Sequence, residues 1–343
     1  MKFRQSMENV WNSNKAPMWL PYLHSIEHIK DDIFRFSYNG GTEETSLKNI
    51  SAIMLYGDFG PLDTRVLEQI CLKGIPIIIH KRNVAVPIYI TRGVRKEQIS
   101  TLEQQILKRA NLKAATHICR KLLAAKFYSM RWLVKTPKIS KNLSIKQLRL
   151  LEAKISRRYW RAFFTKLKLP HLRRRSQSNI KAALDAMSKF ISGIVLRWTT
   201  YHHLSPFHGF LHQQTDYPAL VYDLMEPYRG EFEKFAFQVI ASTKNPEKNS
   251  TLVGAVINET KQALNEHVYT GLTRQIVTRH ELLHGIVLAL KSYLLGKTKK
   301  FMVPTIDKPN GGRPRKVPFR LYGRQAGKTD FWQVAHKVSG GTT

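Results

Sequence analysis

The pattern of the chain changes at Leu102-Glu-Gln-Gln-Ile106-Leu-Lys-Arg-Ala110-Asn-Leu-Lys-Ala114-Ala-Thr-His-Ile118-Cys-Arg-Lys-Leu122. The numbered apolar residues recur every fourth position, so they share one face of a helix. The sequence therefore predicts a mainly α-helical region from about residue 98 to about residue 300. Polar breaks at residues 136–142, 169–178 and 245–250 separate its helices.

Residues 1–95, before this change, show the pattern of strands. Ile33-Phe-Arg-Phe-Ser-Tyr38 alternates, Ala52-Ile-Met-Leu-Tyr56 is a short apolar run, and Ile75-Pro-Ile-Ile-Ile79 precedes Ala85-Val-Pro-Ile-Tyr-Ile90. Residues 63–74 have helical spacing and end on glycine. We therefore expect an α+β protein: a small sheet domain with one embedded helix, followed by helices.

The composition is typical of a globular protein that binds a polyanion. With 343 residues, 43% of them hydrophobic, the chain can bury a substantial core. Its 56 Lys and Arg outnumber its 24 Asp and Glu, a formal net charge of +32, which indicates nucleic acid as the partner. Because the apolar runs are short and the N-terminus has no signal-peptide core, we expect a cytoplasmic protein that does not bind membranes.

The end of the chain is also basic. After Glu281 the sequence holds 12 Lys and Arg against two acids, Asp307 and Asp330. Residues 301–343 are therefore predicted to form a flexible basic tail. Within it, Arg313, Arg315 and Lys316 are expected to bind phosphates.

One acid stands out in the basic part of the helical region. Between Glu103 and Asp185 there are 22 Lys and Arg but a single carboxylate, Glu152. Arg157 and Arg158 follow within two helical turns. Taken alone, Glu152 could form only a surface ion pair with one of these arginines.

Two later phrases add further candidate ligands. Tyr222-Asp223-Leu-Met-Glu226-Pro-Tyr-Arg229 places two carboxylates three residues apart, on one side of a helix, where they could hold a hard divalent cation. Pro206-Phe-His-Gly-Phe-Leu-His212 supplies an imidazole, and Gly209 permits a close backbone approach. Spacing does not choose His212 over the nearby histidines, His202, His203 and His208.

A separate phrase, His280-Glu-Leu-Leu-His284, matches the zinc-protease pattern of two histidines one helical turn apart with a glutamate base. Charged Arg279 precedes it, and no glutamate follows it anywhere downstream. We interpret the phrase as a helix with polar residues on one face, with a protease as the minor alternative.

Three of these phrases together resemble a known family. Glu152-x6-Tyr159-Trp160, Pro206-x2-Gly209-Phe-Leu-His212 and Asp223-Leu-Met-Glu226-x2-Arg229 are similar, in order and spacing, to the three motifs of the CRISPR-associated spacer integrases, the first of the universal Cas proteins. Residues 51–79 resemble that family's β domain with its embedded helix. His203-Leu-Ser-Pro206 replaces the usual Gly-Leu-Asp-Pro, which indicates a divergent branch.

The resemblance implies a fold and a site. It implies a β-sandwich-like domain over residues 1–95 that forms homodimers, an all-α catalytic domain over residues 98–300, and the basic tail over residues 301–343. It also implies a Mn²⁺ or Mg²⁺ site in which Glu152, His212 and Glu226 are catalytic ligands and Asp223 supports them. The residues expected to contact DNA are Arg157, Arg158, Tyr159, Arg173, Arg174, Arg175, Arg229, Arg313, Arg315 and Lys316.

The activity that the resemblance implies is metal-dependent insertion of short DNA fragments, spacers, into a repeat array. A 3′-hydroxyl of the fragment attacks a phosphodiester of the array, which is a transesterification. The small second Cas protein is a possible partner that bridges two dimers. The alternatives are a casposase, the transposon-borne relative, an integrase that acts without a bridging protein, and a non-catalytic scaffold that binds nucleic acid.

Overall fold

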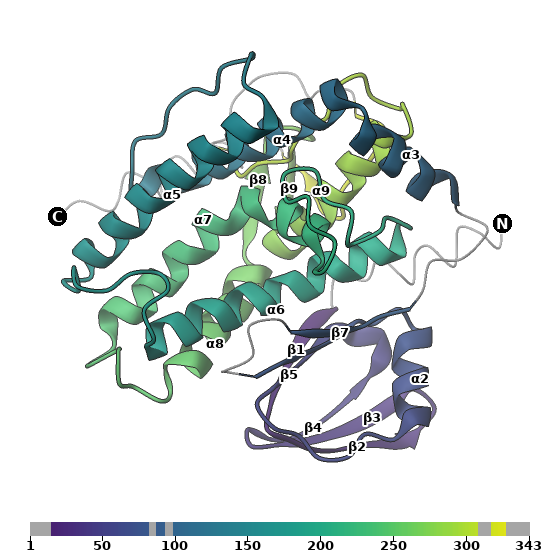
Figure 1. Ribbon diagram of the computed structural model, residues 1–343. Coiled ribbons are helices and arrows are strands. Elements are labelled where there is room, and N and C mark those ends of the chain that lie inside the picture. The colour runs from purple at the N-terminus through teal and green to yellow at the C-terminus, as the bar shows by residue number, and fades with distance from the viewer. Residues whose placement is uncertain (1–14, 82–86, 93–98, 308–316, 327–343) are drawn as a thin grey trace.

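The computed structural model describes residues 15–81, 87–92, 99–307 and 317–326. Figure 1 shows the strands of the N-terminal part gathered beneath a larger group of helices. The N-terminal part consists of β1 (Ala16–Pro21), β2 (Leu23–Lys30), β3 (Ile33–Tyr38), β4 (Gly41–Ser46), the 3₁₀ turn η1 (Leu47–Asn49), β5 (Ile50–Tyr56), α2 (Thr64–Leu72), β6 (Ile77–His80) and β7 (Ile88–Ile90).

The C-terminal part is mainly helical. It consists of α3 (Ile99–Ala110), α4 (Leu112–Ser129), the 3₁₀ turn η3 (Met130–Trp132), α5 (Ile145–Lys166), α6 (Asn179–Tyr201), α7 (Ala219–Ser242), α8 (Leu252–Asn265), β8 (His267–Thr270), β9 (Gln275–Thr278), α9 (Arg279–Leu294) and β10 (Arg324–Gln325). The change from strands to helices near residue 98 and the three polar breaks are confirmed, as is the α+β class.

Two sheets enclose the N-terminal core. One has the order β1-β5-β6-β7, with parallel pairing except between β6 and β7, and the other is the antiparallel sheet β2-β3-β4. Leu20, Phe34, Ile53 and Ile70 of α2 meet in the core between them. The predicted helix is confirmed: the Asp63 carboxylate accepts a hydrogen bond from the first turn of α2.

Strand β5 joins the two parts of the molecule because both of its faces are buried. Ile53 and Leu55 belong to the N-terminal core, whereas Met54 and Tyr56 belong to the core of the helical part. Gly193 of α6 lies so close to Ala52 that an added Cβ would be 3.0 Å from the alanine side chain. Burial on both faces explains why this strand is a continuous apolar run.

Helix α7 lies at the centre of the helical part, where it contacts α4, α6, α8 and α9. The neighbouring helices begin at residues suited to that position. Asn111 caps α4, Ser178 caps α6, and Ser144 forms a capping box with Gln147 at the start of α5. These caps define where α4, α5 and α6 begin.

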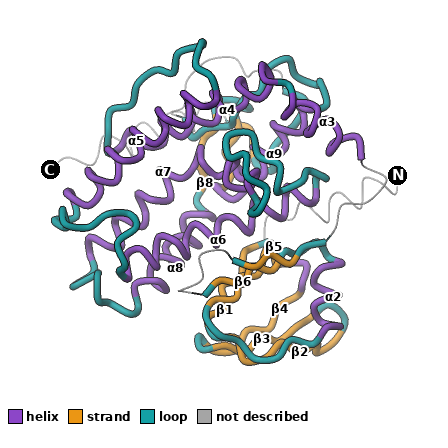
Figure 2. Tube along the Cα trace, viewed as in Figure 1, coloured by secondary structure: helices purple, strands orange, loops and turns teal. Residues whose placement is uncertain are grey.

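Two features of the C-terminal part differ from the sequence-based expectation. The region predicted to be all-α contains a small antiparallel sheet, β10-β9-β8, which Figure 2 shows among the helices. The predicted flexible tail is packed where it is described, because Phe301 and Leu321 are buried and Gln275 donates a 2.7 Å hydrogen bond to the Leu321 carbonyl. Arg313, Arg315 and Lys316 lie outside the described residues. Within the described part, no helix is both long and apolar enough to span a membrane.

Candidate active site

The four candidate ligands come from three segments. Glu152 lies in the third turn of α5, Asp223 and Glu226 lie in the first half of α7, and His212 lies in the loop between α6 and α7. Asp223 and Glu226 are buried, whereas Glu152 and His212 are partly exposed. The structure thus brings together residues that lie far apart in the sequence, such as Glu152 and Glu226, which are 74 positions apart.

Asp223 holds His212 and its loop. The Asp223 carboxylate is fully buried, and its Oδ1 lies 2.6 Å from Nδ1 of His212. It also accepts hydrogen bonds from the backbone N–H groups of Phe210, Leu211 and His212, at 2.5, 2.9 and 3.0 Å. With its oxygens engaged in this way, Asp223 is placed to orient the imidazole, and its predicted part in the metal site stays a prediction.

The groups around His212 favour its protonated form. Burial alone would lower the pKa of His212, but the hydrogen bond to Asp223 and the charges of Asp223 and Glu226 outweigh it and raise the pKa. Since Nδ1 faces Asp223, Nε2 is the ring nitrogen that could bind a ligand.

The loop that carries His212 is held from a second side by α3. The side-chain amide of Gln105 donates to the carbonyls of Ser205 and His208, at 2.9 and 2.8 Å, and accepts from the Ser205 N–H. Arg109 donates to the Gly209 carbonyl at 2.8 Å. The close approach predicted for Gly209 is confirmed, because an added Cβ would lie 2.4 Å from the His212 carbonyl oxygen.

Lys126 of α4 connects the two glutamates, and the sequence analysis did not identify it. Its Nζ lies 2.6 Å from Oε1 of Glu152 and 2.5 Å from Oε2 of Glu226. The residue is 5% exposed. Burial alone would lower the pKa of Lys126, but Glu226 and Glu152 outweigh it and raise the pKa, so the ammonium remains charged.

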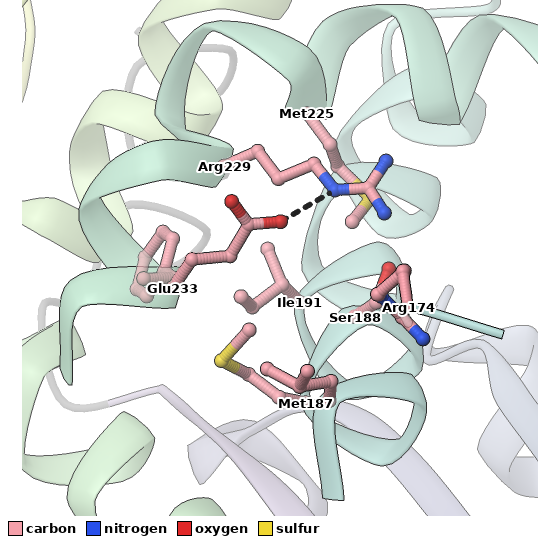
Figure 3. Close-up of a pocket in the computed structure, with 9 residues that line it drawn as sticks. Arg174, Met187, Ser188, Ile191, Met225, Arg229 and Glu233 are labelled. Carbon is pink, nitrogen blue, oxygen red and sulfur yellow. Dashed lines mark hydrogen bonds and ion pairs between the residues drawn. The ribbon is translucent and has the colours of Figure 1, made fainter. Parts of the chain in front are cut away.

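Arg229 makes a second ion pair with Glu226. Its Nη1 lies 3.0 Å from Oε1 of Glu226, and its Nε lies 3.0 Å from Oε1 of Glu233. Figure 3 shows Arg229 reaching to Glu233 along α7, above Met187 and beside a small pocket that Arg174 also lines. Burial alone would raise the pKa of Glu226, but Lys126 and Arg229 lower it to about 2, so this carboxylate is ionised.

Two pockets border the cluster of Glu226, Lys126 and Arg229. One, of about 250 Å³, is lined by His212, Glu226 and Arg229 together with the aromatic and basic side chains of Tyr89, Tyr217, Tyr222 and Lys189. The other, of about 140 Å³, is lined by Glu152, Lys126, Glu233, Tyr159 and neighbouring residues. His212 and Glu152 therefore line different pockets, and Arg229 lines both.

The residue types fit a divalent cation. Among the described residues, no three His, Cys, Asp or Glu side chains converge closely enough to hold a metal ion as they stand. Two carboxylates nevertheless converge on one cationic atom, the Lys126 Nζ, at 2.5 and 2.6 Å. With Nε2 of His212 beside Glu226 in one pocket, the donor set of two carboxylates and an imidazole is one that Mn²⁺ or Mg²⁺ accepts.

The predicted DNA-binding residues divide into exposed and buried sets. Arg157, Arg158, Arg173 and Arg175 are exposed, and α5 adds further exposed cations on the same side of the fold: Lys146, Arg149, Lys154 and Arg161. Arg174 is less available, because it pairs with Asp185 at 2.6 Å and lies over the Trp160 ring.

Two other members of that set, Tyr159 and Arg229, have their contacts within the fold. Tyr159 is fully buried against Trp132 and Phe163, so its contact with DNA stays a prediction that burial does not favour. Arg229 pairs with Glu226 and Glu233 and also lines the pocket beside His212, so its contact with DNA stays a prediction.

The zinc-protease pattern at residues 280–284 is a buried cluster. Nδ1 of His284 lies 3.1 Å from Glu281, and its Nε2 lies 2.9 Å from Nε2 of His202. Glu281 also accepts a hydrogen bond from the Tyr322 N–H at 3.1 Å. The glutamate that would act as base is thus occupied within the fold, as expected for a structural helix.

The fold is shared with several solved structures. A casposase bound to its integration product has 18% identity and a TM-score of 0.70, with 94% of this chain and 99% of that chain covered. A Cas1 protein from Thermotoga maritima has 16% identity and a TM-score of 0.67, covering 83% and 98%. A Cas6-RT-Cas1–Cas2 complex has 15% identity and a TM-score of 0.68, covering 84% of this chain and 36% of that one.

The sequence itself matches the family described as CRISPR associated protein Cas1, over residues 25–141 and 135–254. Because these segments span well over half of the chain, the protein belongs to the Cas1 family. No curated protein matches the sequence.

Proposed function

We propose that the protein is a metal-dependent DNA integrase that joins the 3′-hydroxyl ends of short DNA fragments to phosphodiesters of a repeat array. The observation that carries this proposal is the convergence of Glu152 and Glu226 on one cation beside His212. Membership of the Cas1 family and a net charge of +32 support DNA as the substrate.

Each residue of the site has a distinct part in this proposal. Glu152, Glu226 and Nε2 of His212 would hold a Mn²⁺ or Mg²⁺ ion, which supplies charge stabilisation at the attacked phosphate and favours ionisation of the attacking hydroxyl. Asp223 keeps the imidazole in one orientation. Arg229 keeps Glu226 ionised and in place. Because the DNA hydroxyl is the nucleophile, the reaction requires no covalent bond to the protein.

The surroundings of the site suit a nucleic acid. The exposed cations of α5, the helix that carries Glu152, would provide contacts to phosphates. The pocket beside His212 combines the rings of Tyr89, Tyr217 and Tyr222 with Lys189, a combination that suits a nucleotide next to the reacting phosphate.

The partners follow from the same family membership. We propose a homodimer formed through the N-terminal domain and a complex with the small second Cas protein, since one similar structure is a Cas6-RT-Cas1–Cas2 complex. A casposase-type integrase is the alternative, supported by the similarity in fold to a casposase bound to its integration product. Both versions use the same chemistry and differ in the DNA target.

The test is a joining assay with Mn²⁺, a short duplex and a supercoiled plasmid that carries a repeat array. Wild-type protein should join the duplex to the plasmid, and Glu152→Gln should not, although it still binds DNA. Glu68→Gln, an exposed residue of α2, is the matched control and should be as active as wild type. Joining by Glu152→Gln at the wild-type rate would contradict the site. DNA binding by wild type without joining, even with candidate partners, would favour the non-catalytic scaffold.

A further inference from the structure

Lys126 lies where three helices meet. It projects from α4 to a carboxylate of α5 and a carboxylate of α7, and its side chain is 6% exposed. A lysine so deeply buried is costly unless its charge is paired. Here both partners are candidate ligands of the divalent ion, which sets Lys126 apart from the other cations of the helical part.

The ammonium occupies the space that a metal ion would need. Its contacts of 2.6 Å to Glu152 and 2.5 Å to Glu226 are close to the roughly 2.1 Å at which carboxylate oxygens bind Mg²⁺. Each glutamate has its second interaction elsewhere, Glu152 with the Ser156 hydroxyl at 2.9 Å and Glu226 with Arg229. A divalent ion and an ammonium at one point would repel strongly, so both cannot be bound there together.

A second carboxylate lies within the same pocket as Lys126. Glu233 is 4% exposed and lines the 140 Å³ pocket together with Lys126 and Glu152. Its one side-chain cation in the described structure is Arg229, at 3.0 Å. The pocket thus offers a displaced ammonium both room and a negatively charged partner.

We propose that Lys126 is a resident counter-ion of the metal site. In the metal-free protein it holds Glu152 and Glu226 together, and when a divalent ion binds, its ammonium swings into the adjacent pocket and pairs with Glu233. This inference rests on the proposed function, because it takes Glu152 and Glu226 as metal ligands. It makes Lys126 and Glu233 positioning residues that tune metal affinity.

The test is calorimetric titration of metal-free protein with Mn²⁺, without DNA. Lys126→Met should bind Mn²⁺ about tenfold more tightly than wild type, or better, because no ammonium has to be displaced. Lys121→Met, an exposed lysine of the same helix, should bind like wild type. Equal or weaker binding by Lys126→Met would overturn the proposal.

A double-mutant cycle tests the second position of the ammonium. Glu233→Gln should weaken Mn²⁺ binding when Lys126 is present and should have no effect in the Lys126→Met background. An equal loss in both backgrounds would contradict the swing to Glu233. Lys126→Gln serves as a second variant if the methionine variant does not fold.

The outcome is separable from that of the proposed function. Joining activity is measured on the same preparations but does not enter the titrations. Tighter Mn²⁺ binding by Lys126→Met with no joining by wild type would support the counter-ion and overturn the integrase. Joining by wild type with unchanged Mn²⁺ affinity in Lys126→Met would support the integrase and overturn the counter-ion.

Discussion

Nδ1 of His212 lies 2.6 Å from Oδ1 of Asp223, a carboxylate with no exposed surface. Three backbone N–H groups of the loop before and at His212 donate to the same carboxylate. The orientation of the imidazole and the path of its loop therefore depend on one side chain of α7. In the proposed reaction, Asp223 would act through His212.

Replacing Asp223 by Asn should therefore impair joining more than it impairs DNA binding. An amide cannot accept all four hydrogen bonds, so we expect a loss in joining rate of about 10- to 100-fold and a loss in stability of about 2 kcal/mol. Asp216→Asn, an exposed acid of the same loop, is the control for both joining assays and denaturation curves. If the two variants join DNA at the same rate, the orienting role of Asp223 is wrong.

The stability of the protein should depend on pH through Glu226. The pKa of this carboxyl is lowered to about 2 from 4.5, so its stabilising contribution is complete above pH 4.5 and is lost as the pH falls through 4.5 toward 2. A depression of this size corresponds to about 3 kcal/mol at neutral pH. Urea denaturation across this pH range should show a smaller loss of stability for Glu226→Gln than for wild type.

The control for that series is Glu68→Gln, whose curve should follow wild type because Glu68 is exposed on α2. Parallel curves for wild type and Glu226→Gln would show that Glu226 keeps its ordinary pKa in the folded protein.

The contacts from α3 should hold the His212 loop in place. Gln105→Ala removes three hydrogen bonds to the loop, which involve Ser205 and His208. We expect amide hydrogens of residues 205–213 to exchange faster, with the opening free energy lowered by about 2 kcal/mol. Gln104→Ala, at the neighbouring position of α3, should leave their exchange unchanged. Equal exchange in the two variants would show that α3 does not restrain this loop.

The exposed cations of α5 should supply much of the DNA affinity. Arg157→Ala should weaken binding and make the slope of log affinity against log salt less negative by about one unit if one phosphate contact is lost. Fluorescence anisotropy over a range of salt concentrations measures this slope. Arg65→Ala, which removes an exposed arginine of α2 paired with Asp63, is the comparison and should leave the slope unchanged. If wild type and Arg157→Ala give the same slope, the proposal that α5 binds DNA is refuted.

Two strands with buried apolar residues could be predicted from the sequence, but strand β4 could not. Residues 33–38 alternate and form β3, and the apolar run at residues 52–56 lies within β5. Strand β4, Gly41–Ser46, has no buried residue along its length, so no apolar pattern marks it. Its pairing with β3 depends on backbone hydrogen bonds, which the sequence does not display.

The ligand residues carried local motifs, whereas Lys126 did not. It lies 26 positions before Glu152, and its sequence context does not distinguish it from the many other lysines and arginines around it. The packing of α4 against both α5 and α7 brings it to the two carboxylates. The burial of Tyr159 could have been predicted, because Tyr159 is four residues from both Ile155 and Phe163 and shares their buried face.

The measurement that tests the central claim most directly compares two labelled DNA fragments, one ending in a 3′-hydroxyl and one in a 3′-deoxy nucleotide. Wild-type protein with Mn²⁺ should attach the first fragment covalently to the plasmid and should not attach the second, because the hydroxyl is the nucleophile of the proposed reaction. Glu152→Gln should attach neither. Equal attachment of both fragments, or plasmid cleavage with no attachment of either, would contradict a 3′-hydroxyl integrase at this site.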